Sequence, residues 1–390
     1  MQMRCNDYSI GIHSLIFGLV LGIAVNGLTG VSVQAALLDG LFDGFEESMA
    51  KSAEEKGEKL VIGNFYPAES PDSHGPMGTM GEHTHNEGEF MFTYKYMFMD
   101  MDGMRNGTDD LSSSDVLEDF FVTPTEMTME MHMFGFMYGL NNTVTLAMMI
   151  PYVLNEMDHV NRLGGKFTTR SSGFGDIRMG ALIRLYAFET PSIGSHRFHF
   201  NAGISIPTGD IKATDTVPTP GGPMTTRLPY PMQLGSGTVD LHPGLTYAGS
   251  KGPASWGFQA MGIIRIDENN QGYKRGSEYT LNTYGAYRYA DWISSSLRLK
   301  WRDWANWSGR DTNINQASPA PGVPLVPTAF VNNLGGERLE LFLGTNVLAP
   351  EVLGYEHHFN VEMGRTIYQD LNGPQLELDW TFFVGWQIVK

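Results

Sequence analysis

The segment His196-Arg-Phe-His-Phe-Asn-Ala-Gly-Ile-Ser-Ile206 alternates two kinds of side chain along its length. Apolar residues such as Phe198 and Ile204 occupy every second position, and Arg197 and His199 belong to the positions between them. A period of two is typical of a β-strand whose two faces meet different surroundings. The segment therefore indicates a β protein, and the same pattern recurs along the chain.

Twelve segments carry this alternation, each bounded by clusters of Gly, Pro, Asn or Asp. Most have about the 9–11 residues, or slightly more, that a tilted membrane strand needs. The segments are 88–99, 126–138, 143–152, 174–188, 196–206, 237–248, 254–267, 276–289, 292–303, 337–347, 357–368 and 375–388. Alternation alone fits both a soluble sandwich and a membrane barrel, because each has one apolar and one polar face per strand.

The lengths of the links between these segments favour the barrel. Every second link is under ten residues: 139–142, 189–195, 249–253, 290–291 and 348–356. The others are 100–125, 153–173, 207–236, 268–275, 304–336 and 369–374, and four of these six links exceed twenty residues. Long outer loops, short inner turns and an even strand count are the outer-membrane arrangement. We therefore predict a transmembrane antiparallel up-and-down β-barrel of about 12 strands over residues 88–390, with ten or fourteen strands as alternatives.

Residues 1–35 are expected to be a secretory signal peptide. Arg4 precedes an apolar run, 14–25, and small residues lead to a cleavage site near Ala35. A membrane anchor is the alternative, but glycines interrupt the run and it is shorter than about 20 residues. Cys5, the chain's one cysteine, lies in this signal, so the mature chain is expected to have no disulfide. Together with the barrel, the signal predicts localisation in the Gram-negative outer membrane.

The composition narrows the choice of partners. A net charge of −17 argues against nucleic acid, which requires a basic surface. Charged residues make up 18% of the chain, below the roughly 25% of soluble domains. We expect contacts with outer-membrane lipid and lipopolysaccharide, and a small-molecule or ion substrate. A periplasmic protein partner and the oligomeric state are left open.

A block of histidines and methionines precedes the first predicted strand. It contains His74, Met77, Met80, His83 and His85. Thioether selects Cu(I), and imidazole suits copper, zinc and nickel. The block therefore predicts a site for copper or another soft or borderline metal ion. Residues 36–87 are expected to form an N-terminal periplasmic extension, in which a plug, a partner-binding segment and a disordered segment with incidental histidines are the alternatives to metal binding.

The second predicted strand carries five methionines of one parity: Met127, Met129, Met131, Met133 and Met137. Because methionine is a flexible apolar residue, we expect this face to meet lipid or to pack in a core, with metal binding as the weaker alternative. The opposite parity then directs Glu130 and His132 toward the lumen.

The alternation assigns ionisable residues of both signs to the lumen. The candidates are Glu130, His132, Asp176, Arg178, Arg184, Arg197, His199, Asp240, His242, Arg265, Glu278, Arg288, Glu340, Glu362 and Asp379. Such residues either line a water-accessible interior and select solutes or brace the wall as charge pairs. Both interpretations stay open at this point.

Two motifs carry a family resemblance: Gly173-Phe-Gly-Asp-Ile-Arg-Met-Gly-Ala181 and Ile204-Ser-Ile-Pro-Thr-Gly-Asp210. With them, residues 88–390 resemble the bacterial outer-membrane β-barrel family named after the MetA pathway of phenol degradation. The resemblance implies a non-catalytic channel or transporter for a small, hydrophobic or aromatic solute. One departure is the C-terminus, which ends in Lys390 where such barrels usually end in an aromatic residue.

Signatures of enzymes are lacking in the sequence: it contains no G-x-S-x-G, no H-E-x-x-H and no P-loop. We therefore predict that the protein is not an enzyme. A metal-handling barrel that uses the His/Met block is the second hypothesis, and a hydrolase at the barrel rim is the third.

Overall fold

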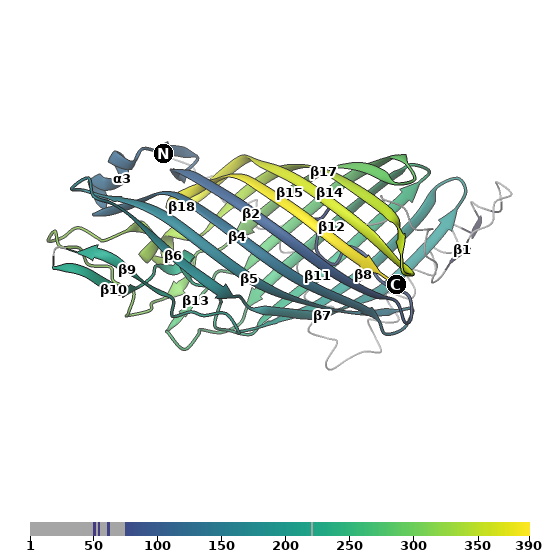
Figure 1. Ribbon diagram of the computed structural model, residues 1–390, viewed down its shortest axis with the longest axis horizontal. Helices are drawn as coiled ribbons and strands as arrows, with labels where there is room; N and C mark the ends of the chain where they lie inside the picture. Colours follow the sequence, from purple (N-terminus) through teal and green to yellow (C-terminus); the bar gives the residue numbers. More distant parts are fainter. Residues whose placement is uncertain (1–49, 52–53, 55–60, 63–74, 220) are drawn as a thin grey trace, which may run out of the picture.

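The computed structural model describes residues 50–51, 54, 61–62, 75–219 and 221–390. The expected signal peptide and His74 lie outside these residues. Within the described residues the chain forms a closed antiparallel β-barrel, which confirms the predicted all-β transmembrane fold (Figure 1). None of the described helices is long and apolar enough to cross a bilayer.

Eleven labelled strands build the wall. They are β2 (Phe90–Gly107), β4 (Val122–Gly139), β5 (Val144–Asn161), β7 (Ile177–Thr190), β8 (Gly194–Ile206), β11 (Asp240–Lys251), β12 (Ala254–Arg265), β14 (Glu278–Ala290), β15 (Ile293–Trp304), β17 (Gly336–Val352) and β18 (Tyr355–Val389). Each pairs with the next, β18 pairs with β2, and β5 pairs with both β4 and β7, which closes the ring.

Strand β18 folds back on itself and supplies two of the wall segments. Its residues 355–371 pair with β17, and its residues 375–389 pair with β2. Gly373 lies between the two arms with a φ of +81°, a conformation that suits glycine at a turn. The Gln369 side chain hydrogen-bonds both the backbone N–H and the carbonyl of Leu378 in the other arm. Ten single strands and two arms thus give twelve wall segments in the described residues, the even number that an all-antiparallel ring requires.

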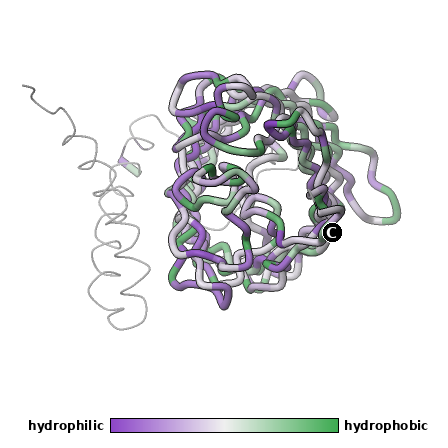
Figure 2. The backbone as a smooth tube through the Cα atoms, turned by 90° about the vertical axis from the view of Figure 1, so that its left-hand side faces the viewer, coloured by the Kyte–Doolittle hydropathy of each residue, from purple (hydrophilic) through white to green (hydrophobic). Residues whose placement is uncertain are grey.

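The remaining elements lie between the wall strands. They are β1 (Val61–Ile62), β3 (Asp109–Leu111), β6 (Lys166–Phe174), β9 (Thr214–Thr219), β10 (Gly222–Arg227), β13 (Tyr273–Lys274), β16 (Ser308–Gly309), α3 (Ser113–Asp119), η1 (Tyr230–Met232), η2 (Pro327–Ala329) and η3 (Val331–Asn333). Figure 1 shows β9, β10 and α3 at one end of the barrel and the C-terminus at the other. Figure 2, which looks along the barrel from the end with the long loops, shows the wall as a ring.

The long loops cover their end of the barrel with a small apolar core of their own. Tyr230, Tyr273 and Ile314 come from three different loops and are fully buried together. Trp307 packs against this cluster, and its ring stacks on Tyr273 at 5.8 Å between centroids. Aromatic packing of this kind holds the loops in one arrangement.

Two predicted loops contain regular structure. The segment 153–173, expected as a loop, consists of the end of β5, a turn and β6. Likewise β2 and β4 extend into the expected loop 100–125, with β3 and α3 between them. The outward faces of these extensions are polar, and Glu156 pairs with Arg170 across β5 and β6. Strand pairing there therefore continues in water, where no apolar face is required.

The outer face of β2, β4 and β5 shows where the lipid ends. Phe92, Tyr94 and Phe98 on β2 point outward, and their partners on β4 include Phe136 and Phe134. The next outward rows are polar: Asp100, Thr128 and Glu156, then Asp102, Glu126 and Asp158. Nine residues of tilted strand below Asp100 span roughly 20–25 Å, about the height of the apolar band of an outer-membrane barrel.

Candidate functional site in the barrel lumen

Residues Gly75–Asn86, here called the crossing segment, run through the inside of the barrel. Side chains from six wall strands donate hydrogen bonds to it or accept them from it. The contacts are Lys95 to the Met77 carbonyl, Glu362 to the Gly78 N–H (2.8 Å), Gln259 to the Met80 carbonyl (2.9 Å), His199 to the Gly81 carbonyl (2.9 Å), Arg184 to the Thr84 hydroxyl (2.9 Å) and Thr145 to the His85 N–H (2.8 Å). These partners belong to β2, β18, β12, β8, β7 and β5, which lie around the whole ring. The crossing segment therefore spans the lumen.

A buried ion pair anchors one side of the crossing segment. Arg298 on β15 donates two hydrogen bonds to Glu362, at 2.7 and 2.9 Å, and a third to Asn282 at 2.9 Å. Both charged side chains are 1% exposed, and the Arg298 guanidinium lies 3.9 Å above the Phe342 ring centroid. A Cβ on Gly78 would stand 2.0 Å from Arg298 Nη2 and 2.7 Å from Glu362 Oε2. Only glycine lets the segment approach this pair so closely.

The histidines of the crossing segment have carboxylate partners. His83 Nδ1 lies 2.8 Å from Glu82 Oε1, and His85 Nδ1 lies 3.6 Å from Glu89 Oε2. The nearby His85 imidazole and the hydrogen bonds from Asn86 lower the pKa of Glu89 to about 2. Burial lowers the pKa of His85, so this ring is neutral at neutral pH.

The predicted metal ligands are only partly together. The rings of His83 and His85 are 4.9 Å apart at their centroids. Met77 packs instead against Phe342 and Phe383, and its side chain lies over Gly385. Among the described residues, no group of three or more His, Cys, Asp or Glu side chains is arranged to hold a metal. Metal binding by this block stays a prediction that the geometry does not favour.

Toward the loops, beyond the crossing segment, the lumen carries a layer of charges on β7, β11, β12, β14, β15 and β17. Arg302 and Arg265 both contact Glu278, and Arg265 also pairs with Asp240. Lys300 lies 2.8 Å from Glu340, which Arg338 approaches at 3.6 Å. These are the wall-bracing pairs expected of a polar interior. Although they point inward, Arg302 and Lys300 keep 28% and 22% of their side chains exposed, so solvent reaches this layer.

The methionine wall, defined as Met97 and Met99 of β2 with Met129 and Met131 of β4, lines another part of the lumen. Met97 pairs with Met131, and Met99 pairs with Met129. They share the inward parity of Lys95, which contacts the crossing segment. The structure therefore corrects the prediction that the β4 methionines face lipid.

The same register corrects the placement of Glu130 and His132. Both share the face of the exposed Phe134 and point out of the barrel. The Tyr96 hydroxyl donates to Glu130 at 2.9 Å, and the Tyr94 hydroxyl lies 2.8 Å from His132 Nδ1. The reason for the error is that both faces of β2 are apolar, aromatic outside and methionine inside, so hydrophobicity could not orient this pair of strands.

The other lumen candidates divide as follows. The inward positions of the wall include Arg178, Arg184, Arg197, His199, Asp240, His242, Arg265, Glu278, Arg288, Glu340 and Glu362. Asp176 is bonded to the loop residues Gly209 and Ser236. Asp379 lies at a register irregularity between Leu378 and Trp380, near Arg365, Asp100 and Asp102. It therefore lies with the outer polar rows rather than in the lumen.

The neutral amides of the lumen are absent from the candidates drawn from the sequence. Asn201, Gln259 and Asn282 are all buried and bind the crossing segment or Arg298. The alternation already assigned them to the inward face. Their contribution was missed because the selection considered only ionisable side chains.

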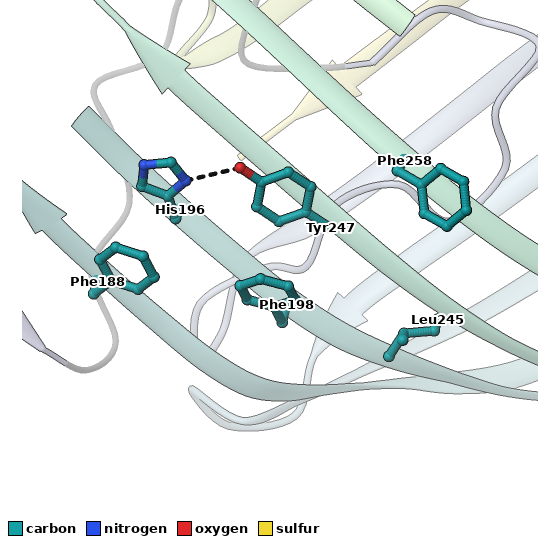
Figure 3. A pocket seen from close by; sticks show the side chains of 6 residues that line it. All are labelled: Phe188, His196, Phe198, Leu245, Tyr247 and Phe258. Carbon is teal, nitrogen blue, oxygen red and sulfur yellow. Dashed lines mark hydrogen bonds between the residues drawn. The ribbon is translucent and has the colours of Figure 1, made fainter. Parts of the chain in front are cut away.

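A separate groove of about 540 Å³ lies on the outside of the barrel. Its lining is aromatic and apolar: Phe188, His196, Phe198, Leu245, Tyr247 and Phe258 (Figure 3). His196 Nδ1 and the Tyr247 hydroxyl are 2.9 Å apart. Leu245 and Phe258 are exposed on the lipid side, so this groove does not belong to the lumen.

Fold and lumen define a transmembrane β-barrel whose interior is crossed by its own N-terminal chain. A family model described as "Putative MetA-pathway of phenol degradation" matches residues 112–298, which confirms the resemblance drawn from the sequence. The COG4313 outer membrane channel from Pseudomonas putida F1 is similar, with a TM-score of 0.52 and 14% identity over 80% of this chain and 99% of that chain.

Two further solved structures are matched more weakly. A Pseudomonas aeruginosa FadL homologue has a TM-score of 0.36 and 9% identity over 78% of this chain and 90% of that chain. The P. putida toluene transporter TodX has a TM-score of 0.33 and 8% identity over 78% of this chain and 90% of that chain. No curated protein matches the chain. The similarity to the COG4313 channel supports the fold.

Proposed function

We propose that the protein is a non-catalytic outer-membrane channel for a small solute, in which the crossing segment acts as a plug. The observation that carries this proposal is the arrangement of the lumen. A segment of chain spans it through hydrogen bonds to side chains, which can be exchanged for water without disturbing the strand ladders. Beyond the segment the inward side chains remain partly exposed.

The wall supports a path along the barrel axis. A barrel of about 8 strands has an interior that side chains just fill, and the diameter grows with strand number. Twelve wall segments therefore leave room for both the crossing segment and a solute. The family description names phenol degradation, which favours a small aromatic or hydrophobic solute. The Gram-negative outer membrane is the membrane in which such barrels are found.

Replacing Gly78 with valine tests the plug. The new side chain would collide with Arg298 and Glu362, so the crossing segment is expected to detach and the single-channel conductance in planar bilayers to rise severalfold. Gly285→Val is the matched control, because a Cβ at Gly285 meets only the Ser255 carbonyl at 4.0 Å. Heat-modifiable mobility on gels verifies that each variant folds as a barrel.

A second variant tests the plug independently, in case Gly78→Val does not fold. Lys95→Met removes the hydrogen bond to the Met77 carbonyl while keeping the length of the side chain. It should also raise the conductance, by less than Gly78→Val. If folded wild-type protein and both folded variants pass no ions at any voltage, the channel proposal is wrong. If the wild type conducts as well as both variants, the proposal that the crossing segment is a plug is wrong.

A further inference from the structure

The charge layer beyond the crossing segment is net positive in a strongly acidic protein. Six cations and four carboxylates interact within it: Arg178, Arg265, Arg275, Lys300, Arg302 and Arg338 with Asp176, Asp240, Glu278 and Glu340. The chain as a whole carries −17. Two uncompensated positive charges inside a low-dielectric wall attract anions, because the field of the wall is focused into the lumen.

Arg178 is the cation best placed to take an external anion. It points inward from β7, where its register partner is the buried Ser205. Its side chain forms no hydrogen bond and no ion pair with the described residues, although Glu278 and Asp176 lie close enough to interact with its charge. Its guanidinium therefore keeps the fork of donors that binds a carboxylate with two parallel hydrogen bonds.

The methionine wall faces the middle of this charge layer across the lumen and lies near its β7 end. In the ring, β2 and β4 are six wall segments from β12 and β14, and β4 is two segments from β7, which carries Arg178. Both surfaces begin one inward position beyond the crossing segment: Met97 follows Lys95 on β2, and Lys300 follows Arg298 on β15. The four methionines are half-buried: Met97 packs partly against Met77 of the crossing segment, and Met129 packs partly against the loop residues Leu228 and Met232.

We propose that this level of the lumen binds a small amphipathic anion, an aromatic or aliphatic carboxylate. The carboxylate lies against Arg178, with Arg302 as its second cation, and the apolar body lies against the methionine wall. Binding sites for small molecules combine mostly apolar linings with a few placed polar groups, and flexible methionines adapt to apolar ligands of different shapes. This inference rests on the proposed channel function, since it names the class of solute.

The test uses benzoate, benzyl alcohol and acetate as probes on the full chain. Benzoate carries both the anion and the apolar body, benzyl alcohol lacks the charge, and acetate lacks the ring. Binding is measured by calorimetry in detergent, and relative permeability by reversal potentials in planar bilayers or by liposome swelling. Wild-type protein should bind benzoate more tightly than either of the other probes.

Arg178→Gln should weaken benzoate binding by about tenfold, the loss expected when a charge-assisted hydrogen-bond pair is removed. Because Arg178 forms no ion pair, its removal leaves no carboxylate without a partner and the barrel should fold. Arg365→Gln is the matched control, since Arg365 is exposed on the outer face over Trp380. Met131→Ser should weaken benzoate binding and leave acetate binding unchanged, whereas Met363→Ser on the outer face should change neither.

Each result decides the proposal. Equal benzoate affinity in wild type and Arg178→Gln, or equal affinity of wild type for benzoate and acetate, overturns the amphipathic anion site. Selective loss in Arg178→Gln and Met131→Ser supports it. Benzoate binding with these losses, but without current or swelling for any solute, would refute the channel function and leave the binding site intact.

Discussion

In the β2–β4 wall and in the β15–β17 wall, residues alternate between the lumen and the outer face. The first wall presents methionines to the lumen, and the second presents charged residues. On β15 the inward residues are Arg298, Lys300 and Arg302, while Leu297 points to the lipid. On β4 the inward residues are methionines, while Glu130 points outward. β15 obeys the expectation of a polar inside and an apolar outside. β4 reverses it in its central part, and β2 is apolar on both faces.

The reversal on β4 shows that an apolar face can line the lumen as well as meet the lipid. Part of the methionine surface packs against protein, since Met97 contacts the cluster of Met77 and Met129 contacts the cluster of Met232. The methionines also differ from the aromatic residues behind them, because Phe and Tyr are stiff and bulky whereas methionine rotates about three bonds. The flexible methionines thus form the inner surface of these strands, and the stiffer aromatic residues form the outer surface, which meets the lipid.

The largest effect is expected from breaking the charged wall at Arg298. Arg298→Ala leaves Glu362 buried at 1% exposure with only the Gly78 N–H as a donor, which should cost about 3–5 kcal/mol in free energy of unfolding. Urea titration in lipid vesicles measures this cost. The double variant Arg298→Ala/Glu362→Gln should recover much of the loss. Equal destabilisation in the single and double variants would contradict the view that an uncompensated charge causes it.

An intermediate effect should distinguish the faces of the two walls. Met363 of β18 is exposed to lipid, and Met131 of β4 points into the lumen, at similar distances from the short-turn end. Met363→Arg should cost about 2 kcal/mol in unfolding free energy, because a charge on the lipid face is destabilising, and Met131→Arg should cost clearly less. The same vesicle titrations measure both. If Met131→Arg lowers the free energy of unfolding more than Met363→Arg does, the β4 methionines face the lipid and the inward placement is wrong.

Most of the wall could be predicted from the sequence, because period-two alternation is a local signal. Every one of the twelve predicted segments overlaps a wall segment, and 357–368 and 375–388 correspond to the two arms of β18. Inward charges such as Arg184 and Glu362 followed from the same alternation, since their neighbours are apolar. Orientation failed on β4, where the register with Lys95 of the neighbouring β2 is needed to decide, and at Asp379, where a register irregularity shifts the alternation.

The crossing segment could be suspected from the sequence but not located. Its decisive contacts join residues far apart, such as Gly78 with Glu362, which are separated by 284 positions. No local pattern encodes such pairs. Histidines that suggested metal ligands lie beside Glu82 and Glu89 instead, within one and four residues, but only the fold decides whether such neighbours turn toward each other.

The smallest effect concerns the outer face of the methionine wall, where Glu130 meets the lipid next to the first polar row. The Tyr96 hydroxyl donates to this carboxylate at 2.9 Å, so Tyr96→Phe removes a hydrogen bond to a charged group and should cost about 1 kcal/mol in unfolding free energy. The cost stays small because Thr128 and Asp100 begin the water-facing rows one step away, where the carboxylate can be hydrated. Tyr94→Phe, which affects only a bond to His132, should cost less. In a Glu130→Leu background Tyr96→Phe should have no effect, since the interaction is already gone. A full cost in that background would mean that Tyr96 stabilises the wall through its ring, and that the outward placement of Glu130 contributes nothing.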